Sequence, residues 1–266
     1  MPDVPVTIKS LLEMKAAAHK ISCLTCYDAS FTRLLEAAGV EVLLVGDSLG
    51  MVVQGRESTL PVTLDEMVYH TRNVARARQR ALIVADMPFM SYRSSTLALE
   101  SAGRLMKEGG AHMVKLEGGS SQLETVRRLA TLGIPVCGHL GLLPQSVHKL
   151  GGYRVQGRDP ADAARLREDA MALQQAGADL LVLECVPAPL AGEISRALTI
   201  PVIGIGAGSG TDGQVLVLYD ILGMHDKPPR FVKNFLQLGG SIQRALQDYV
   251  QAVRNGSFPN PEQSYR

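Results

Sequence analysis

Eight short apolar segments that alternate with longer helical stretches constrain the fold of this chain more than any other feature. Each segment is bounded by turn residues and most are rich in Val, Ile and Leu, which is typical of strands buried on both faces. Strands that alternate with helices form parallel sheets, and eight such units predict a closed (β/α)8 TIM barrel. The segments are Ile21–Cys26, Glu41–Val45, Leu82–Ala85, His112–Leu116, Pro135–Gly138, Asp179–Leu183, Pro201–Ile205 and Val215–Tyr219.

Helix start signals support this pattern. Thr63 followed by Glu66 has the spacing of a capping box, and so does Ser10 followed by Glu13, which indicates a helix ahead of the first strand. Barrels of this type commonly contain about 250 residues in one unit. We therefore predict an α/β fold, a single (β/α)8-barrel catalytic domain over residues 1–266 with an N-terminal helix.

An open, doubly wound sheet is the competing architecture, and it usually carries a nucleotide fingerprint. The glycine-rich segment 204–210 fails that fingerprint, because its third glycine would have to stand at Ser209 or Thr211. The segment also lacks the lysine of a P-loop. We interpret it as a tight turn that leaves room for a ligand, with an anion-binding turn as the alternative.

Composition excludes several classes of function. The 27 basic residues nearly balance the 26 acidic ones, and there is no Trp, so nothing indicates a nucleic acid or a membrane surface as a partner. No apolar run reaches the roughly 18 residues of a membrane span, and no signal peptide precedes the first helix, so we expect a cytoplasmic protein. Cys23 and Cys26 resemble a metal motif, but on a strand they would point to opposite faces.

Carboxylates follow three consecutive predicted strands at the ends that carry the active site of a barrel. These residues are Asp47, Asp86 and Glu117. Neighbouring strands lie about 4.8 Å apart, so the three side chains could converge, and they would repel one another without a cation between them. Oxygen ligands favour a hard ion such as Mg²⁺. A single Asp at a strand end is more often a turn or capping residue, and the conjunction of three weakens that alternative.

Three further polar residues lie at strand ends. Lys115 shares a strand face with Glu117, where it could bind an anion or form an ion pair. Glu184 follows the sixth apolar segment, and a partly desolvated carboxylate there is a better general base near neutral pH, a salt bridge being the alternative. His139 could hydrogen-bond a substrate or a metal ligand, or be a histidine satisfied by the protein.

A long polar segment, Leu142–Asp159, contains several glycines. Loops of this length inside compact domains are usually binding loops or lids that close over a site.

Eight motifs follow one another between about Thr7 and Pro259: residues 24–30, 45–51, 58–63, 86–89, 114–119, 136–142, 151–153 and 203–208. Together they resemble the ketopantoate hydroxymethyltransferases, also called 3-methyl-2-oxobutanoate hydroxymethyltransferases. Two positions depart from the family pattern, Leu143 where a small hydroxyl residue is usual and Tyr219 where His is frequent.

The resemblance implies a Mg²⁺-dependent enzyme of pantothenate biosynthesis. It would transfer a hydroxymethyl group from the co-substrate 5,10-methylenetetrahydrofolate to 2-oxoisovalerate (3-methyl-2-oxobutanoate) and give ketopantoate (2-dehydropantoate). By motif match, Asp47 and Asp86 would bind Mg²⁺, with Glu117 in or next to the metal shell. The family forms cytoplasmic homo-oligomers, usually decamers.

The resemblance also assigns the substrate contacts. Ser48 and Lys115 would hold the oxo acid, together with the metal-binding Asp47 and Asp86, and we add His139 as a further candidate substrate contact. Glu184 would be the catalytic base that forms a Mg-stabilised enolate.

Two alternatives stay open on the sequence. The first is a Mg-dependent C–C lyase or mutase of the phosphoenolpyruvate mutase and isocitrate lyase type, many of which use a lid cysteine that is absent from Leu142–Asp159. The second is an inactive barrel retained as a scaffold, which would be expected to have lost some of the four carboxylates.

Overall fold

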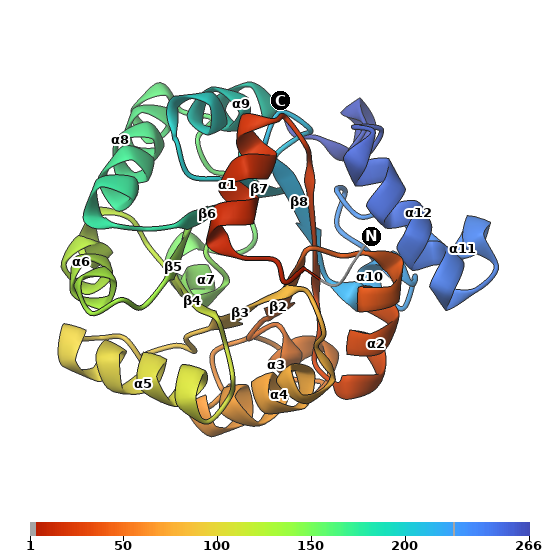
Figure 1. Ribbon diagram of the computed structural model, residues 1–266. Helices are drawn as coiled ribbons and strands as arrows, with labels where there is room; N and C mark the ends of the chain where they lie inside the picture. Colours follow the sequence, from red (N-terminus) through yellow and green to blue (C-terminus); the bar gives the residue numbers. More distant parts are fainter. Residues whose placement is uncertain (1–3, 226) are drawn as a thin grey trace.

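The computed structural model describes residues 4–225 and 227–266, and its strands close into a parallel barrel in chain order (Figure 1). The predicted (β/α)8 barrel is therefore confirmed. The strands are β1 (Ile21–Thr25), β2 (Val42–Val45), β3 (Leu82–Asp86), β4 (Met113–Glu117), β5 (Val136–Gly141), β6 (Leu180–Glu184), β7 (Val202–Ile205) and β8 (Gly213–Leu216).

Helices surround the barrel (Figure 1). Two hydrophobic clusters fill the space inside and outside the sheet. The longer helices are α2 (Ala29–Ala38), α4 (Leu64–Ala77), α5 (Ser95–Lys107), α6 (Leu123–Thr131), α8 (Pro160–Ala176), α9 (Ala188–Ala197) and α12 (Ile242–Arg254). Short helices are α3 (Leu49–Val52), α7 (Val147–Leu150), α10 (Leu218–Ile221) and α11 (Leu236–Gly239). None of the helices within the described ranges is both long and apolar enough to span a membrane.

The eighth strand lies earlier in the chain than the sequence indicates. Gly213 pairs with Ile21 of β1, whereas Leu218 belongs to α10 and its backbone N–H donates to Thr25 Oγ1 at 2.9 Å. The apolar run continues from β8 into this helix, so hydrophobicity alone could not separate the two elements. The opposite-face prediction for the cysteine pair is confirmed, because Cys23 lies inside the barrel and Cys26 in the outer cluster.

The glycine-rich turn between β7 and β8 packs against the chain itself. Residues 206–212 join the two strands without a helix. Gly206 and Gly208 have φ values of +59° and +75°, and a Cβ on Gly208 would lie 2.4 Å from Ala188 Cβ. The glycines therefore permit close packing of protein on protein, which replaces our interpretation of a turn that leaves room for a ligand.

The predicted N-terminal helix is α1 (Ile8–Ala16), which covers one end of the barrel (Figure 1). Its Leu11 is buried in the same cluster as the inward-facing strand residues. The predicted capping box at Ser10 was wrong, because Thr7 caps the helix and accepts a hydrogen bond from Ser10 N at 3.2 Å. The box at Thr63 was correct, and it begins α4.

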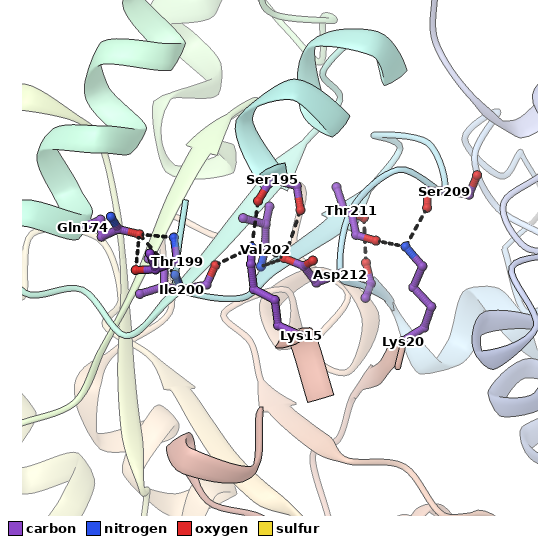
Figure 2. Close-up of polar contacts among 11 residues, drawn as sticks. Lys15, Lys20, Gln174, Ser195, Thr199, Ile200, Val202, Ser209, Thr211 and Asp212 are labelled. Atoms are coloured by element: carbon purple, nitrogen blue, oxygen red, sulfur yellow. Dashed lines mark hydrogen bonds and ion pairs between the residues drawn. The ribbon is translucent and has the colours of Figure 1, made fainter. Parts of the chain in front are cut away.

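One ion pair fastens α1 to α9 and to the connections that precede β7 and β8 (Figure 2). Lys15 Nζ lies 2.7 Å from Asp212 Oδ2 and also donates to the carbonyl oxygens of Ser195 and Ile200. The same carboxylate accepts from Ser195 Oγ at 2.9 Å and Val202 N at 2.8 Å. Asp212 therefore joins α1, α9 and the start of β7.

Replacing Asp212 by alanine should destabilise the barrel, because Lys15 would lose its ion-pair partner in a site where its side chain is only 14% exposed. We expect the free energy of unfolding in urea to fall by about 2–3 kcal/mol. Lys9→Ala is the control, since its pair with Glu13 is exposed, and it should change stability by less than about 0.5 kcal/mol. Equal effects of the two substitutions would contradict this role for Asp212.

Candidate active site

All of the predicted site residues line one cavity of about 1220 Å³. Asp47 follows β2, Asp86 ends β3, Glu117 ends β4 and Glu184 ends β6, so the cavity lies at the C-terminal end of the barrel. This is the end at which barrels carry their active sites. The residues are Asp47, Ser48, Asp86, Lys115, Glu117, His139 and Glu184.

A buried ion pair lies at the centre of the site. Lys115 Nζ is 2.8 Å from Asp86 Oδ1, both side chains are 5% exposed, and the two residues face each other across β3 and β4. The second oxygen of Asp86 accepts a hydrogen bond from Asp47 N at 3.1 Å. Burial opposes the charge on Lys115, but Asp86, Glu117 and Asp47 outweigh it and raise the lysine pKa, so Lys115 is a permanent cation.

The predicted carboxylates crowd one another. Asp47, Asp86 and Glu117 are all buried, and burial followed by repulsion from Asp86 and Glu117 raises the pKa of Asp47 well above its usual value. Lys115 lowers that pKa but does not offset the other charges. The negative charge of the three carboxylates therefore exceeds the positive charge of Lys115, and a bound cation would relieve the repulsion between them.

Gln145, which sequence reasoning missed, orients two of these carboxylates. Its side-chain amide donates to Asp47 Oδ2 at 2.8 Å, and its backbone N–H donates to Glu117 Oε2 at 3.0 Å. The amide also donates to Met87 O at 3.0 Å, and its oxygen accepts from the buried hydroxyl of Tyr92. Gln145 is part of a short 3-10 helix, Pro144–Ser146, inside the segment expected to be a functional loop. The prediction that Leu142–Asp159 is a functional loop was the available signal, but it did not single out Gln145.

His139 lies between two carboxylates. Its Nε2 is 3.2 Å from Glu184 Oε2 and its Nδ1 is 3.6 Å from Glu117 Oε1. Burial and Lys115 oppose protonation, but the two glutamates prevail and raise the pKa of His139. Neither ring nitrogen has a well-aligned hydrogen-bond partner among residues 4–225 and 227–266. The ring is thus held by charge more than by fixed hydrogen bonds.

The backbone around Glu184 is held tightly, while its side chain is 15% exposed and reaches the cavity. Glu184 O accepts from Leu142 N at 2.8 Å, and a Cβ on Gly141 would lie 2.2 Å from that oxygen. The next residue, Cys185, has a φ of +49°, which is strained for a residue with a side chain. This strained conformation therefore occurs directly after Glu184, whose side chain reaches the cavity.

Ser48 is linked to the aromatic side of the cavity. Its Oγ lies 2.9 Å from the hydroxyl of Tyr27, whose ring stacks on Tyr219 with centroids 5.8 Å apart. A Cβ on Gly46 would lie 2.7 Å from Ser48 Oγ, so a larger residue there would displace this hydroxyl. Tyr219, which departs from the family pattern, therefore supports Tyr27 from the side.

The donor set suits a hard divalent cation. Within the described ranges, no group of three or more His, Cys, Asp and Glu side chains is arranged to hold a metal by itself. Mg²⁺ does not require such a group, because it keeps several waters and binds through one or two carboxylates. Asp47, Asp86 and Glu117 all carry such oxygens, and each already accepts a hydrogen bond, Asp47 and Glu117 from Gln145 and Asp86 from Lys115 and Asp47 N. The residues fit Mg²⁺ better than a tetrahedral Zn²⁺ site.

Solved structures of low sequence identity share the fold. Phosphoenolpyruvate phosphomutase from Streptomyces platensis subsp. rosaceus has a TM-score of 0.62 at 14% identity, covering 82% of this chain and 83% of that one. A phosphonopyruvate hydrolase in complex with oxalate and Mg²⁺ has a TM-score of 0.60 at 10% identity, covering 79% and 80%. At these identities the likeness shows the barrel alone.

Relatives of high sequence identity decide the family. The 3-methyl-2-oxobutanoate hydroxymethyltransferase of Halorhodospira halophila is 62% identical, over 98% of this chain and 94% of that protein. The enzyme of the same name from Nitrosococcus oceani is 61% identical, over 98% and 99%. The family description "Ketopantoate hydroxymethyltransferase" matches residues 5–261. The chain belongs to the ketopantoate hydroxymethyltransferase family.

Proposed function

We propose that this chain transfers a hydroxymethyl group from 5,10-methylenetetrahydrofolate to 2-oxoisovalerate and forms ketopantoate in pantothenate biosynthesis. The observation that carries the proposal is the placement of Asp47, Asp86, Lys115 and Glu184 around one cavity in a member of this family. The set contains an anion-binding cation, oxygens for a metal and a base for a C–H proton.

The buried end of the cavity binds the oxo acid. Lys115 supplies the positive charge that attracts its carboxylate, and Ser48 Oγ supplies a hydroxyl for a hydrogen bond. Asp47 and Asp86 would hold Mg²⁺, which when bound polarises the ketone and carboxylate oxygens and makes the C3 proton more acidic. His139 lines the same end and is a candidate substrate contact.

Glu184 removes the C3 proton of the oxo acid. Its carboxylate faces the cavity, and the strained backbone at Cys185 fixes where it points. Lys115 stabilises the negative charge that develops on the substrate oxygens. C3 then attacks the methylene carbon of the donor. One C–C bond and one C–O bond to an oxygen from water form, and the two C–N bonds of that methylene carbon break. The donor nitrogens take up the C3 proton and one proton of the water.

Gln145 acts as a positioning residue in this reaction. By donating to Asp47 Oδ2, it fixes the rotation of that carboxylate and leaves Oδ1 for a ligand. Its backbone N–H at the same time holds Glu117 beside His139. Outer hydrogen bonds of this kind typically change metal affinity by about 10–100-fold when they are removed.

The chain is proposed to act in the cytoplasm as a homo-oligomer, and specifically as a decamer. The support is the family match together with the assembly that the family resemblance implies. Light scattering of the purified protein should give ten times the mass of the 28.6 kDa chain. A monomer mass at working concentrations would contradict the assembly.

The reaction is tested by proton NMR of 2-oxoisovalerate in D₂O with the protein, Mg²⁺ and methylenetetrahydrofolate. We expect C3–H exchange without the donor, ketopantoate with it, and neither after chelation of the metal. Glu184→Gln should lower the exchange rate by about 10²–10⁴-fold, because a positioned base contributes that much. Exchange at the wild-type rate in Glu184→Gln would remove Glu184 as the base. Activity on a phosphonate or isocitrate alone would favour the lyase alternative.

Metal binding is tested by calorimetric titration of Mg²⁺ in the presence of the oxo acid. Asp86→Asn removes a charged ligand of the metal. Loss of an outer hydrogen bond typically weakens metal binding by about 10–100-fold, and Asp86→Asn should weaken Mg²⁺ binding by more than that. Gln145→Ala should weaken binding by about tenfold, because Asp47 loses its orientation. Asp65→Asn, an exposed carboxylate paired with Arg104, is the control and should bind Mg²⁺ like the wild type. An unchanged titration for Asp86→Asn would exclude it as a ligand.

A further inference from the structure

The chain ends in the wall of the candidate active site. Tyr265, the penultimate residue, lines the same cavity as the proposed base Glu184, although no strand of the barrel carries it. The C-terminal segment, residues 260–265, comes back to the barrel beside α9, where the end of the chain lies in Figure 1. A segment that follows α12 therefore reaches the end of the barrel that carries the site.

Contacts on both sides hold the C-terminal segment in place. Arg230 Nε donates to Glu262 O at 2.7 Å, and the guanidinium carbon of Arg230 lies 5.9 Å from the centroid of the Tyr265 ring. The backbone carbonyl of Tyr265 accepts a hydrogen bond from Ala188 N at 2.9 Å. Tyr265 is thereby fixed relative to the start of α9, the helix that follows Glu184 in the chain.

Tyr265 packs against the residue that comes directly after the base. A Cβ on Gly206 would lie 3.2 Å from Tyr265 Cε2, so the ring lies over the turn after β7. Ile205, the last residue of β7, accepts a hydrogen bond from Cys185 N at 2.9 Å. Burial, and then Glu184, raise the pKa of the Cys185 thiol, and a hydrogen bond with Tyr265 opposes that rise. The thiol therefore stays protonated, and its contact with the phenol joins two neutral groups.

The backbone of Cys185 needs support of this kind. Its φ of +49° is disfavoured for a residue with a side chain and persists only where surrounding contacts hold it. Two backbone hydrogen bonds hold its peptide groups, from Cys185 N to Ile205 O and from Gln156 N to Cys185 O, both at 2.9 Å. Neither of them restrains the thiol, which is buried beside Tyr265. Without the tyrosine, Cys185 could relax toward negative φ, and the carboxylate of Glu184 would turn with it.

We propose that Tyr265 is a positioning residue for the enolisation step. By packing against Cys185, it holds the left-handed backbone that directs Glu184 into the cavity. Tyr265 acts through Cys185 and need not touch either reactant. The inference rests on the proposed function, because it takes Glu184 as the base that removes the C3 proton.

The test is the rate of C3–H exchange of 2-oxoisovalerate in D₂O with Mg²⁺ and without the one-carbon donor. Tyr265→Ala should lower the rate at saturating oxo acid by about 10–100-fold, because a misplacement of about 1 Å can cost about 10²-fold. The KM for the oxo acid and the calorimetric Mg²⁺ titration should stay at wild-type values, since Asp47, Asp86 and Lys115 are not displaced. A wild-type titration also shows that the variant folds.

Two further variants serve as the matched controls. Tyr265→Phe keeps the ring over Gly206 and should exchange C3–H within about twofold of the wild-type rate, because a hydrogen bond between neutral groups contributes little. Tyr69→Ala removes a tyrosine that is 59% exposed on α4, away from the cavity, and should behave like the wild type. If Tyr265→Ala does not fold, Tyr265→Leu, which keeps an apolar side chain of shorter reach, provides the same comparison.

Substitution of Cys185 separates positioning from packing. Glycine adopts positive φ without the penalty of a side chain, so in the Cys185→Gly background Tyr265→Ala should lower the exchange rate by no more than about threefold. Cys185→Ala removes the thiol but keeps the strained backbone, and there Tyr265→Ala should still cost about tenfold or more.

Three results would overturn the role of Tyr265 while leaving Glu184 as the base. They are a wild-type exchange rate in Tyr265→Ala, a loss that appears only as a higher KM for the oxo acid, and equal losses in the Cys185→Gly and Cys185→Ala backgrounds. Exchange at the wild-type rate in Glu184→Gln would instead overturn the base itself, and this inference with it.

Discussion

The repulsion among the buried carboxylates at the top of the barrel is the constraint on which the site depends. Asp47, Asp86 and Glu117 lie in a region that water does not screen, and Lys115 is the buried lysine among them. The remaining charge is distributed by hydrogen bonds, of which those from Gln145 are the most direct. If the fold did not hold these carboxylates rigidly, they would move apart, or they would bind protons in place of a cation.

Rigidity comes from the opposite end of the molecule. There α1 covers the barrel, and Leu11 extends the inner hydrophobic cluster while Lys15 joins Asp212. Both ends use a lysine–aspartate pair with an oxygen–nitrogen distance of 2.7 to 2.8 Å, but the lower pair holds only structure. Because the lower end is closed and the helices fix the strands laterally, the carboxylates at the upper end have little freedom to move apart. The residues that close and stabilise the barrel and the residues of the candidate active site thus lie at opposite ends of the barrel.

The sequence predicted the parts of the site that belong to strands. Asp86 and Glu117 could be placed because the residue that ends a buried parallel strand has a defined position in a barrel. Gln145 and Tyr153 could not, since they belong to a connection whose path is set by contacts with distant residues such as Asp47 and Met51. The eighth strand was misplaced for a related reason, because its polar and glycine residues are specified by pairing with β1 and not by hydrophobicity.

The same distinction explains how one barrel supports different reactions. Structures that share only the fold with this chain include a phosphomutase and a phosphonopyruvate hydrolase, so the strand arrangement alone does not choose a reaction. Barrels vary their chemistry largely through the segments that follow the strands. In this chain the connection after β5 contributes Gln145 to the acidic end and Arg154 to the mouth. One segment therefore orients the buried carboxylates and also adds a cation to the lining of the same cavity.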